Sequence, residues 1–451
     1  MKIVYFFTRD LRIPDNKCLY SACKEATSII PIFVFTPEQV SKNSYKSNNA
    51  IQFMIESLED LNRELNNKLN LFYGKYDKIL EEIIKNENPD KIFMTKDYTP
   101  YAVRREESLK KVCEKYDIEA SFHEDYCLYP PNKILTLSGN PYQKYTPYYR
   151  SALKITPDKT VKVNLPKIKK INSNFSFIEA KKLYVENQDL NRRGGRKNGL
   201  KQMENLKNIK DYSDIRNELP HKTTELSAYI KFGNVSIREV YWNVRKLYGV
   251  KSEIIAQLIW HDFYYQLGYN FPNIFGHALK PQYDKIKWSK NEKTLTAWKE
   301  GKTGYPIVDA CMTQLNETGY MHNRGRLIVA SFLVKTLLHD WREGEKYFAQ
   351  KLEDYDPLVN NGNWQWVSSS GADSQPYFRI FNPWLQSKRF DTDGTYIKKY
   401  LPVLNDIPPK ELHEWDKNYQ KYPSLKYPKP IVNYATAKDN VLSSYKKALL
   451  N

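Results

Sequence analysis

The feature that most constrains the fold is an alternation, over residues 1–125, of short apolar runs with amphipathic stretches. Four runs have the length and the β-branched and aromatic content of buried strands: IVYFF (3–7), IIPIFVF (29–35), LNLFYG (69–74) and KIFMT (91–95). Three stretches among them carry apolar residues at helical spacing: 49–66, 76–86 and 102–116. Because parallel strands need a crossover connection that a helix commonly supplies, this order predicts an α/β, doubly wound parallel sheet.

The segments after these strands carry the next predictions. Sheets of this kind bind ligands at the carboxyl ends of their strands, which predicts a ligand near TRDLR (8–12) and the 96–101 loop. Residues 127–210 are rich in Pro, Lys and Asn and have weak periodicity. Within them, RRGGRK (192–197) is interpreted as a solvated connector, with a surface cluster that touches DNA as the alternative.

The chain from about residue 211 onward is predicted to be helical, and all nine tryptophans lie beyond residue 241. TGYPIVDACMTQL (303–315) has Pro306 near a helix start, and RLIVASFLVKTLL (326–338) is apolar nearly all round, as a buried helix is. We therefore expect three parts: an α/β domain over 1–130, a connector over 131–205 and an all-α domain over 206–451.

Composition narrows the class of protein. A formal net charge of +18 indicates a polyanionic partner such as a nucleic acid, with a solvated lysine-rich surface as the alternative. No apolar run approaches the ~20 residues of a membrane span, and the N-terminal apolar stretch is too short for a signal peptide. We therefore expect a cytoplasmic protein without a membrane partner. Five cysteines without a C-x-x-C pair fit a reducing compartment and argue against a zinc ribbon.

Two stretches of the predicted helical domain suit a ligand. HKTTELSAYIKFGNVS (221–236) clusters hydroxyl side chains at a predicted helix start: Thr223, Thr224 and Ser227. Free backbone N–H groups there favour an anion, although an ordinary helix cap explains the same residues. QLIWHDFYYQL (257–267) spaces three side chains on one helix face with a histidine beside them: Gln257, Trp260, Tyr264 and His261. Such a stripe is either core packing or one wall of a ligand site.

Two further stretches place polar groups in apolar surroundings. GYMHNRGRLIV (319–329) contains Asn323, Arg324 and Arg326, and a buried charge there needs a partner. LEDYDPLVNNGNWQW (352–366) sets two carboxylates and an amide before two indoles: Asp354, Asp356, Asn360, Trp364 and Trp366. The spacing lacks the ligand pattern of a calcium loop, so we predict no metal, and the paired indoles favour a flat aromatic ligand.

These stretches, in this order, resemble the DNA photolyase/cryptochrome family, and in particular its class I cyclobutane pyrimidine dimer photolyases. The resemblance runs from FTRDLR (7–12) to NPWLQSKRFDTDGTYIKKYLP (382–402). It is strongest in three strings: WKEGKTGYPIVDACMTQLNETGYMHNRGR (298–326), DWREGEKYF (340–348) and NNGNWQWVSSSGADSQPYFRIFNP (360–383). It implies an α/β antenna domain and an all-α domain that binds FAD. A second antenna chromophore (deazaflavin, flavin or folate) stays open, because KDYTPYAVRRE (96–106) lacks the Asn-Glu pair that holds a folate.

The resemblance also implies roles for individual residues. FAD would be held by Tyr212, Thr223, Thr224, Leu226, Ser227, Arg326, Asp354, Asp356 and Asn360. Asp354 would pair with Arg326 beside the flavin, Asp356 would hydrogen-bond its polar edge, and Asn360 would lie near N5. Electrons would reach the flavin through Trp364, Trp341 and Trp288, named from the flavin outward. The damaged DNA would meet Arg216, Gln257, Trp260, His261, Tyr264, Asn323, Arg324 and Trp366.

The function implied is light-driven repair of cyclobutane dimers in ultraviolet-damaged DNA by a monomeric carbon–carbon lyase, through electron transfer from photoexcited reduced FAD. Two alternatives remain. Gln257 stands where cyclobutane enzymes have Glu, which resembles (6-4) photoproduct photolyases, although the pair of histidines of those enzymes is absent at Asn323 and Leu327. A cryptochrome photoreceptor would share the fold. The absence of a G-x-G-x-x-G motif argues against a nicotinamide-dependent oxidoreductase.

Overall fold

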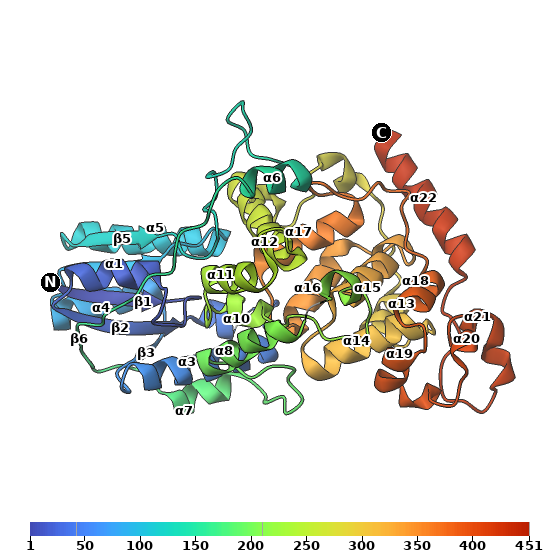
Figure 1. Ribbon diagram of the computed structural model, residues 1–451, viewed down its shortest axis with the longest axis horizontal. Helices are drawn as coiled ribbons and strands as arrows, with labels where there is room; N and C mark the ends of the chain where they lie inside the picture. Colours follow the sequence, from blue (N-terminus) through green and yellow to red (C-terminus); the bar gives the residue numbers. More distant parts are fainter. Residues whose placement is uncertain (42, 210, 451) are drawn as a thin grey trace.

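The computed structural model describes residues 1–41, 43–209 and 211–450. The chain forms an α/β part that contains the N-terminus and a helical part that lies beside it and contains the C-terminus (Figure 1). Within the described ranges, every helix is too short or too polar to cross a lipid bilayer.

The α/β part is built on a parallel sheet with the strand order β3-β2-β1-β4-β5, and β6 adds to β2. The strands are β1 (Lys2–Phe7), β2 (Ser28–Phe35), β3 (Asn70–Tyr73), β4 (Lys91–Thr95), β5 (Glu119–His123) and β6 (Lys167–Ile168). The central strand β1 pairs Val4 with Ile30 on one side and with Ile92 on the other. The predicted doubly wound sheet and its first four strands are confirmed. Strand β5 escaped detection because its half-exposed sequence EASFH lacks a continuous apolar run.

Helices cover both faces of this sheet, because successive side chains of a strand point to opposite faces. Ile3, Tyr5 and Phe7 pack with α1 (Lys17–Glu25) and α3 (Asn48–Glu64). Val4 and Phe6 pack with α4 (Tyr76–Glu87) and α5 (Pro100–Lys115). Burial of each apolar side chain of this kind stabilises the fold by about 1.5–3 kcal/mol. Because both faces of β1 are buried, its sequence is one continuous apolar run.

The segment RRGGRK was predicted to be solvated, and the structure contradicts this. Gly194, Gly195 and Arg196 are all buried. The backbone of Gly194 lies so close to α3 that a Cβ would fall 2.1 Å from the carbonyl oxygen of Phe53. The Arg196 Nη2 donates to Glu239 Oε1 at 2.7 Å. The two glycines therefore permit close docking, and the arginine joins this segment to the helical part.

The helical part consists of the helices that follow residue 211. Its helices are α9 (Tyr212–Ile215), α10 (Ser227–Lys231), α11 (Ile237–Tyr248), α12 (Glu253–Asn270), α13 (Glu292–Lys299), α14 (Pro306–Thr318), α15 (Asn323–Lys335), α16 (Trp341–Lys351), α17 (Pro357–Ser368), α18 (Pro383–Phe390), α19 (Thr395–Tyr400), α20 (Pro409–Leu412), α21 (Trp415–Asn418) and α22 (Tyr434–Leu450). Smaller helices α2 (Pro37–Val40), α6 (Tyr145–Ala152), α7 (Phe177–Ala180) and α8 (Arg196–Glu204) lie earlier in the chain. Pro306 is the first residue of α14, as predicted. Helix α15 ends at Lys335, before the predicted boundary, and Leu338 adopts a positive φ of 56°.

The two parts dock through the loop that follows β1. The amide of Leu11 donates to the carbonyl of Phe232 at 3.0 Å, and Arg12 donates to the carbonyl of Gly233 at 3.2 Å. Gly233 has a φ of 68°, and a Cβ there would lie 2.3 Å from the carbonyl oxygen of Arg9. The segment TRDLR, near which a ligand was predicted, therefore also packs against the helical part. The carboxyl end of the central strand therefore serves domain docking.

Candidate functional site

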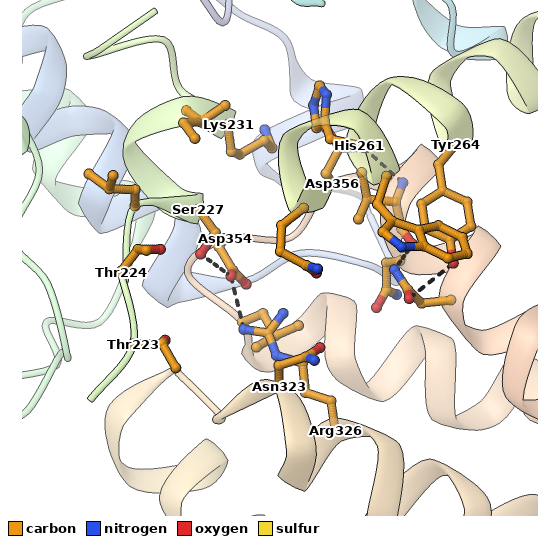
Figure 2. A pocket seen from close by; sticks show the side chains of 18 of the residues that line it. Thr223, Thr224, Ser227, Lys231, His261, Tyr264, Asn323, Arg326, Asp354 and Asp356 are labelled. Carbon is orange, nitrogen blue, oxygen red and sulfur yellow. Dashed lines mark hydrogen bonds and ion pairs between the residues drawn. The ribbon is translucent and has the colours of Figure 1, made fainter. Parts of the chain in front are cut away.

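A cavity of about 430 Å³, within the usual range of cofactor sites, lies at the centre of the helical part. It is walled by α10, α12, α15 and α17 and by the loops that precede them (Figure 2). Among the sequence-predicted site residues, those that line it are Tyr212, Arg216, Thr223, Thr224, Leu226, Ser227, Gln257, Trp260, His261, Tyr264, Asn323, Arg326, Asp354, Asp356, Asn360, Trp364 and Trp366. Arg324, Trp341 and Trp288 do not line it.

One side of the cavity is organised by Asp354. Its Oδ2 accepts hydrogen bonds from Arg326 Nη2 at 2.9 Å and from Ser227 Oγ at 2.6 Å (Figure 2). Burial opposes the charge of Arg326, but the carboxylate of Asp354 outweighs it and raises the pKa of Arg326. Oδ1 of Asp354 is buried and has no hydrogen-bond partner within the described chain. A buried carboxylate oxygen without a donor is costly, so this atom is suited to receive an N–H or O–H group from a ligand.

Asp356 is held differently, because both of its oxygens are already bonded to protein donors. Oδ1 accepts from the backbone amides of Leu358 and Val359 at 3.0 and 3.1 Å and caps α17. Oδ2 accepts from Arg9 and from Tyr265, each at 2.7 Å. Burial alone would raise the pKa of Asp356, but Arg9 and weaker positive neighbours lower it to about 2. Asp356 therefore anchors the start of α17 as an ionised cap.

Asn360 lies one turn further along α17 and is oriented by a buried acid. Its Nδ2 donates to the backbone carbonyl and to Oε1 of Glu345, both at 3.1 Å. Tyr355 donates to the same Oε1 at 3.2 Å, and burial raises the pKa of Glu345. With its amide nitrogen engaged in this way, Asn360 presents its oxygen as an acceptor toward the cavity. Sequence analysis missed Glu345, although it lies within the string DWREGEKYF.

An aromatic wall stands at another side of the cavity. The ring of Trp260 stacks on Tyr145 with a centroid distance of 3.7 Å and an interplanar angle of 9°, and Tyr264 packs at 5.5 Å. The hydroxyl of Tyr145 donates to the carbonyl of Ala256 on the same helix as Trp260, at 2.6 Å. Tyr145 therefore supports one face of Trp260. Sequence analysis missed this residue because it belongs to the predicted connector, where only the tyrosine run YTPYY (145–149) marked it.

The predicted relay tryptophans lie at different depths. Trp364 lines the cavity from α17 and Trp341 is buried at the start of α16, which packs against α17. Trp288 is half-buried, and its ring meets Tyr445 at 6.1 Å. The ring of Trp298, a residue that sequence analysis did not select, has its centre 6.3 Å from that of the Trp364 ring.

Arginines gather beside the cavity. Arg324 donates to Asn217 Oδ1 at 2.7 Å and lies 4.3 Å from the centre of the Phe390 ring. Burial, and then the positive charges of Arg216, Arg389 and Arg379, lower the pKa of Arg324 to about 10. A group of cations that repel one another, of which Arg216 lines the cavity, is an attractive site for an anion such as phosphate. Sequence analysis missed Arg379 and Arg389, which lie in FRIFNPWLQSKRF (378–390).

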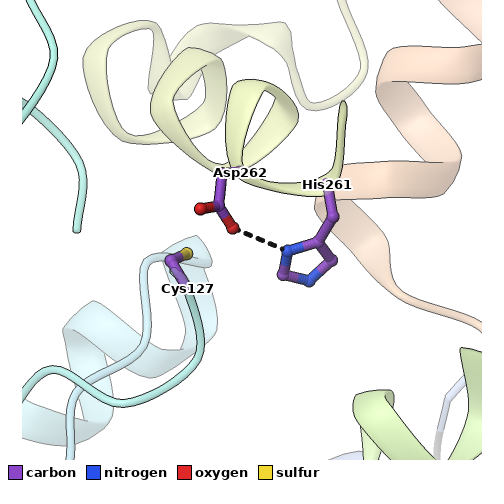
Figure 3. A group of neighbouring side chains, drawn as sticks. All are labelled: Cys127, His261 and Asp262. Atoms are coloured by element: carbon purple, nitrogen blue, oxygen red, sulfur yellow. Dashed lines mark hydrogen bonds and ion pairs between the residues drawn. The ribbon is translucent and has the colours of Figure 1, made fainter. Parts of the chain in front are cut away.

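His261 belongs to a group with Cys127 and Asp262, whose ligand-type atoms lie within 4.8 Å of one another (Figure 3). Nδ1 of His261 lies 3.1 Å from Oδ1 of Asp262, and Oδ2 of Asp262 accepts from the backbone amide of Tyr129 at 2.9 Å. Burial is the main cause of a raised pKa for Asp262. Because both carboxylate oxygens are engaged by protein groups, we interpret this group as a support that orients His261 toward the cavity.

A parallel-sheet domain docked on a helical domain, with a central cavity lined by carboxylate, amide and indole groups, defines a two-domain cofactor-binding protein. Comparison with known proteins specifies the family. The family model described as the FAD binding domain of DNA photolyase matches residues 254–447, and the DNA photolyase model matches residues 3–167. The chain is 34% identical over 485 residues to the deoxyribodipyrimidine photo-lyase of Buchnera aphidicola subsp. Acyrthosiphon pisum, covering 100% of this chain and 98% of the relative. The chain therefore belongs to the DNA photolyase family.

Solved structures agree with this assignment. The archaeal photolyase from Sulfolobus tokodaii, solved with two FAD molecules, has a TM-score of 0.91 and 38% identity, over 99% of this chain and 100% of that one. The cryptochrome of Synechocystis sp. PCC6803 has a TM-score of 0.89 and 25% identity, over 98% of each chain. The α/β antenna-type domain and the helical FAD-binding domain expected from the sequence are confirmed.

Proposed function

We propose that the protein uses light to repair cyclobutane pyrimidine dimers in ultraviolet-damaged DNA, with FAD in the central cavity. The observation that carries the proposal is that one cavity combines a buried acceptor, Asp354 Oδ1, which has no partner among the described residues, with an indole wall and with Arg216, next to which Arg324 lies. The test is to incubate the reduced protein with oligonucleotides that carry defined lesions, with and without blue light, and to measure lesion loss. Light-independent loss, or none at all, would contradict the proposal.

The residues present fit FAD. A flavin ring carries an N–H donor beside carbonyl acceptors, and the unpartnered Asp354 Oδ1 beside the Arg326 guanidinium offers the complementary acceptor and donor. Tyr212, Thr223 and Thr224 line the same cavity and supply polar groups for the rest of the cofactor. We assign the contact with the flavin edge to Asp354 rather than to Asp356, whose oxygens are both engaged elsewhere. When bound, FAD would supply light absorption and a transferable electron.

The chain's own groups would then orient the partners and exclude water. Asn360 would present its amide oxygen to the ring, because Glu345 holds the nitrogen. Trp364 and Trp341 would pass electrons inward, since indoles are oxidisable and lie on packed helices. The remaining predicted member, Trp288, would connect this route to solvent.

A lesion flipped out of the DNA stack would meet the aromatic wall. Trp260 and Trp366 line the cavity and can replace the lost base stacking, and the Tyr145 stack holds Trp260 in place. Gln257 and Asn323 supply amide donors and acceptors to base edges. Arg324, together with Arg216, would take the flanking phosphates, which gives the net charge of +18 a role.

The (6-4) photoproduct is the second candidate lesion, and His322 argues against it. That chemistry needs a proton donor, and His322 is buried with a pKa lowered to about 4 by desolvation and then by Arg324. Its Nδ1 accepts from the amide of Arg324 at 3.1 Å, so it caps α15 as a neutral ring. A cryptochrome-type photoreceptor is favoured only by the structural likeness to the Synechocystis protein. Light-dependent loss of a cyclobutane lesion, without loss of a (6-4) lesion, would distinguish cyclobutane-dimer repair from (6-4) repair and from a photoreceptor without repair activity.

We also propose a second chromophore in the α/β domain. Among deazaflavin, flavin and folate we place a flavin first, because the Sulfolobus tokodaii relative was solved with two FAD molecules. The ratio of released flavin to protein measures this directly, and a ratio of one with no other chromophore would exclude it. The five cysteines are all free, which fits the cytoplasmic location that we propose for a monomeric enzyme.

A further inference from the structure

Arg9 leaves the α/β part and ends inside the helical part. Its Nη1 donates to Asp356 Oδ2 at 2.7 Å, and its Nη2 donates to the hydroxyl of Tyr265. On the α/β side, its Nε lies 3.3 Å from Asp97 Oδ2, and the guanidinium lies 4.6 Å from the centre of the Tyr126 ring. Only 13% of the Arg9 side chain is exposed. Arg9, which belongs to the segment TRDLR, thus reaches Asp356, the residue that caps α17 in the helical part.

The helix that Arg9 reaches carries three candidate site residues. Asp356 caps α17 through the amides of Leu358 and Val359. Asn360, Trp364 and Trp366 follow along this helix and all line the central cavity. A shift of the cap moves all three together, because the helix is rigid over its 12 residues.

We propose that Arg9 is a positioning residue for the flavin site, which holds Asp356 ionised and thereby fixes the placement of α17. This inference rests on the proposed function, because it takes FAD as the ligand whose site α17 helps to form. It gives the α/β part a second task, in addition to the binding of an antenna chromophore. Arg9 does not touch the cavity itself, so it acts only through Asp356 and Tyr265.

The electrostatics around Asp356 support this role. The titratable or charged groups that act on it, or that it acts on, come from several elements: Arg9, Cys127, Lys231, His261, Tyr265 and Tyr355. Asp97 acts on Arg9, Tyr265 and Lys231. Among all of these groups, only Arg9 and Tyr265 donate a side-chain hydrogen bond to the carboxylate of Asp356. Burial would raise the pKa of Asp356, and Arg9 is the largest influence that lowers it.

The effect of Arg9 on the pKa of Asp356 determines how FAD affinity should change with pH. With Arg9 present, Asp356 keeps its charge down to the pKa of about 2, so it does not titrate near neutral pH. Without Arg9, burial dominates and the pKa of Asp356 rises, so that the cap loses its charge as the pH falls through a milder range. FAD affinity should then fall toward acid pH more steeply in the variant than in the original protein, where Lys231 on the cavity wall, with a pKa lowered by burial to about 7, titrates in the same range.

The test measures the affinity of the apoprotein for FAD, by quenching of flavin fluorescence, between about pH 5 and about pH 8. We expect Arg9→Met to bind FAD about tenfold more weakly at the acid end than at the neutral end, because FAD affinity falls about tenfold for each pH unit below the raised pKa of Asp356. Arg9→Lys, which keeps the charge, should restore most of the original profile. Adding Asp356→Asn to Arg9→Met should remove the part of the pH dependence that comes from the cap, because the cap can then no longer titrate.

Arg12→Met is the matched control. Arg12 lies in the same loop, is buried and bonds to the helical part through Gly233, but it makes no contact with Asp356. It should lower the melting temperature while leaving the pH profile of FAD affinity as in the original protein. An Arg9→Met profile parallel to that of the original protein, or one reproduced by Arg12→Met, would overturn the inference. Failure of the original protein to bind FAD at any pH would instead overturn the proposed function.

Discussion

Arg326 and Ser227 both donate to the same carboxylate oxygen of Asp354, at 2.9 and 2.6 Å, and the other oxygen of Asp354 has no partner among the residues that the structure describes. The three residues come from α15, α10 and the loop before α17, so the arrangement exists only when these elements are packed. A buried acceptor left open beside a guanidinium is the feature of the cavity that most directly calls for a ligand.

Asp354→Asn should release FAD. The change removes the charge that compensates Arg326, whose side chain is 26% exposed, and we expect a loss of about 2 kcal/mol in FAD binding. Flavin absorbance per protein after purification measures it. Asp393→Asn, which changes an exposed acid of the same domain, serves as the control. Full FAD retention in Asp354→Asn would show that the flavin edge is held elsewhere.

Trp364→Phe should block photoreduction of oxidised flavin, because Trp364 is the predicted relay member that lines the cavity. Repair by chemically pre-reduced protein should persist, since repair recycles its own electron. Blue-light bleaching of the flavin band with an external donor present measures photoreduction. Trp298→Phe is the control, because Trp298 contacts Trp364 at 6.3 Å but lies outside the predicted relay. If Trp298→Phe abolishes photoreduction as well, the route runs through Trp298.

Arg324→Ala should weaken binding to ultraviolet-damaged DNA and reduce the salt dependence of binding by about one phosphate contact. The physical reason is that Arg324 belongs to a group of arginines whose mutual repulsion a phosphate relieves. Fluorescence anisotropy at several salt concentrations gives the slope. Lys115→Ala, on α5 of the α/β part and 60% exposed, should leave the slope unchanged. Equal slopes for Arg324→Ala and the original protein would exclude a phosphate contact there.

His322 should make the protein less stable in mild acid. Its pKa of about 4 in the folded chain lies below the ordinary value near 6.5, so folding favours the neutral ring. This contribution is fully present above about pH 6.5 and is lost as the pH falls toward 4, with a maximum of about 3 kcal/mol. His322→Asn, which keeps a good helix cap, should flatten the dependence of the melting temperature on pH. His277→Asn, at a histidine that is 71% exposed, should not.

The sequence by itself determined the elements whose signal is local. Strands β1 to β4 were predicted because a strand buried on both faces is a continuous apolar run. Helix α14 was predicted because Pro306 marks its start. The strings that resemble the photolyase family identified many of the residues that line the cavity, because a match of sequence does not depend on knowing the fold. Helix α1 was missed, although Asn16 caps it, because its 9 residues are too few to establish a helical period in the sequence.

Only the tertiary structure decided which polar groups are already engaged. Arg9 and Asp356 lie 347 positions apart, and their bond is the reason why we propose Asp354, rather than Asp356, for the contact with the flavin edge. Gly194 was read as solvated because no local pattern reveals that α3 packs on it. Periodicity reports how a segment meets its own neighbours, whereas the satisfaction of a buried charge depends on partners that only the packed chain brings together.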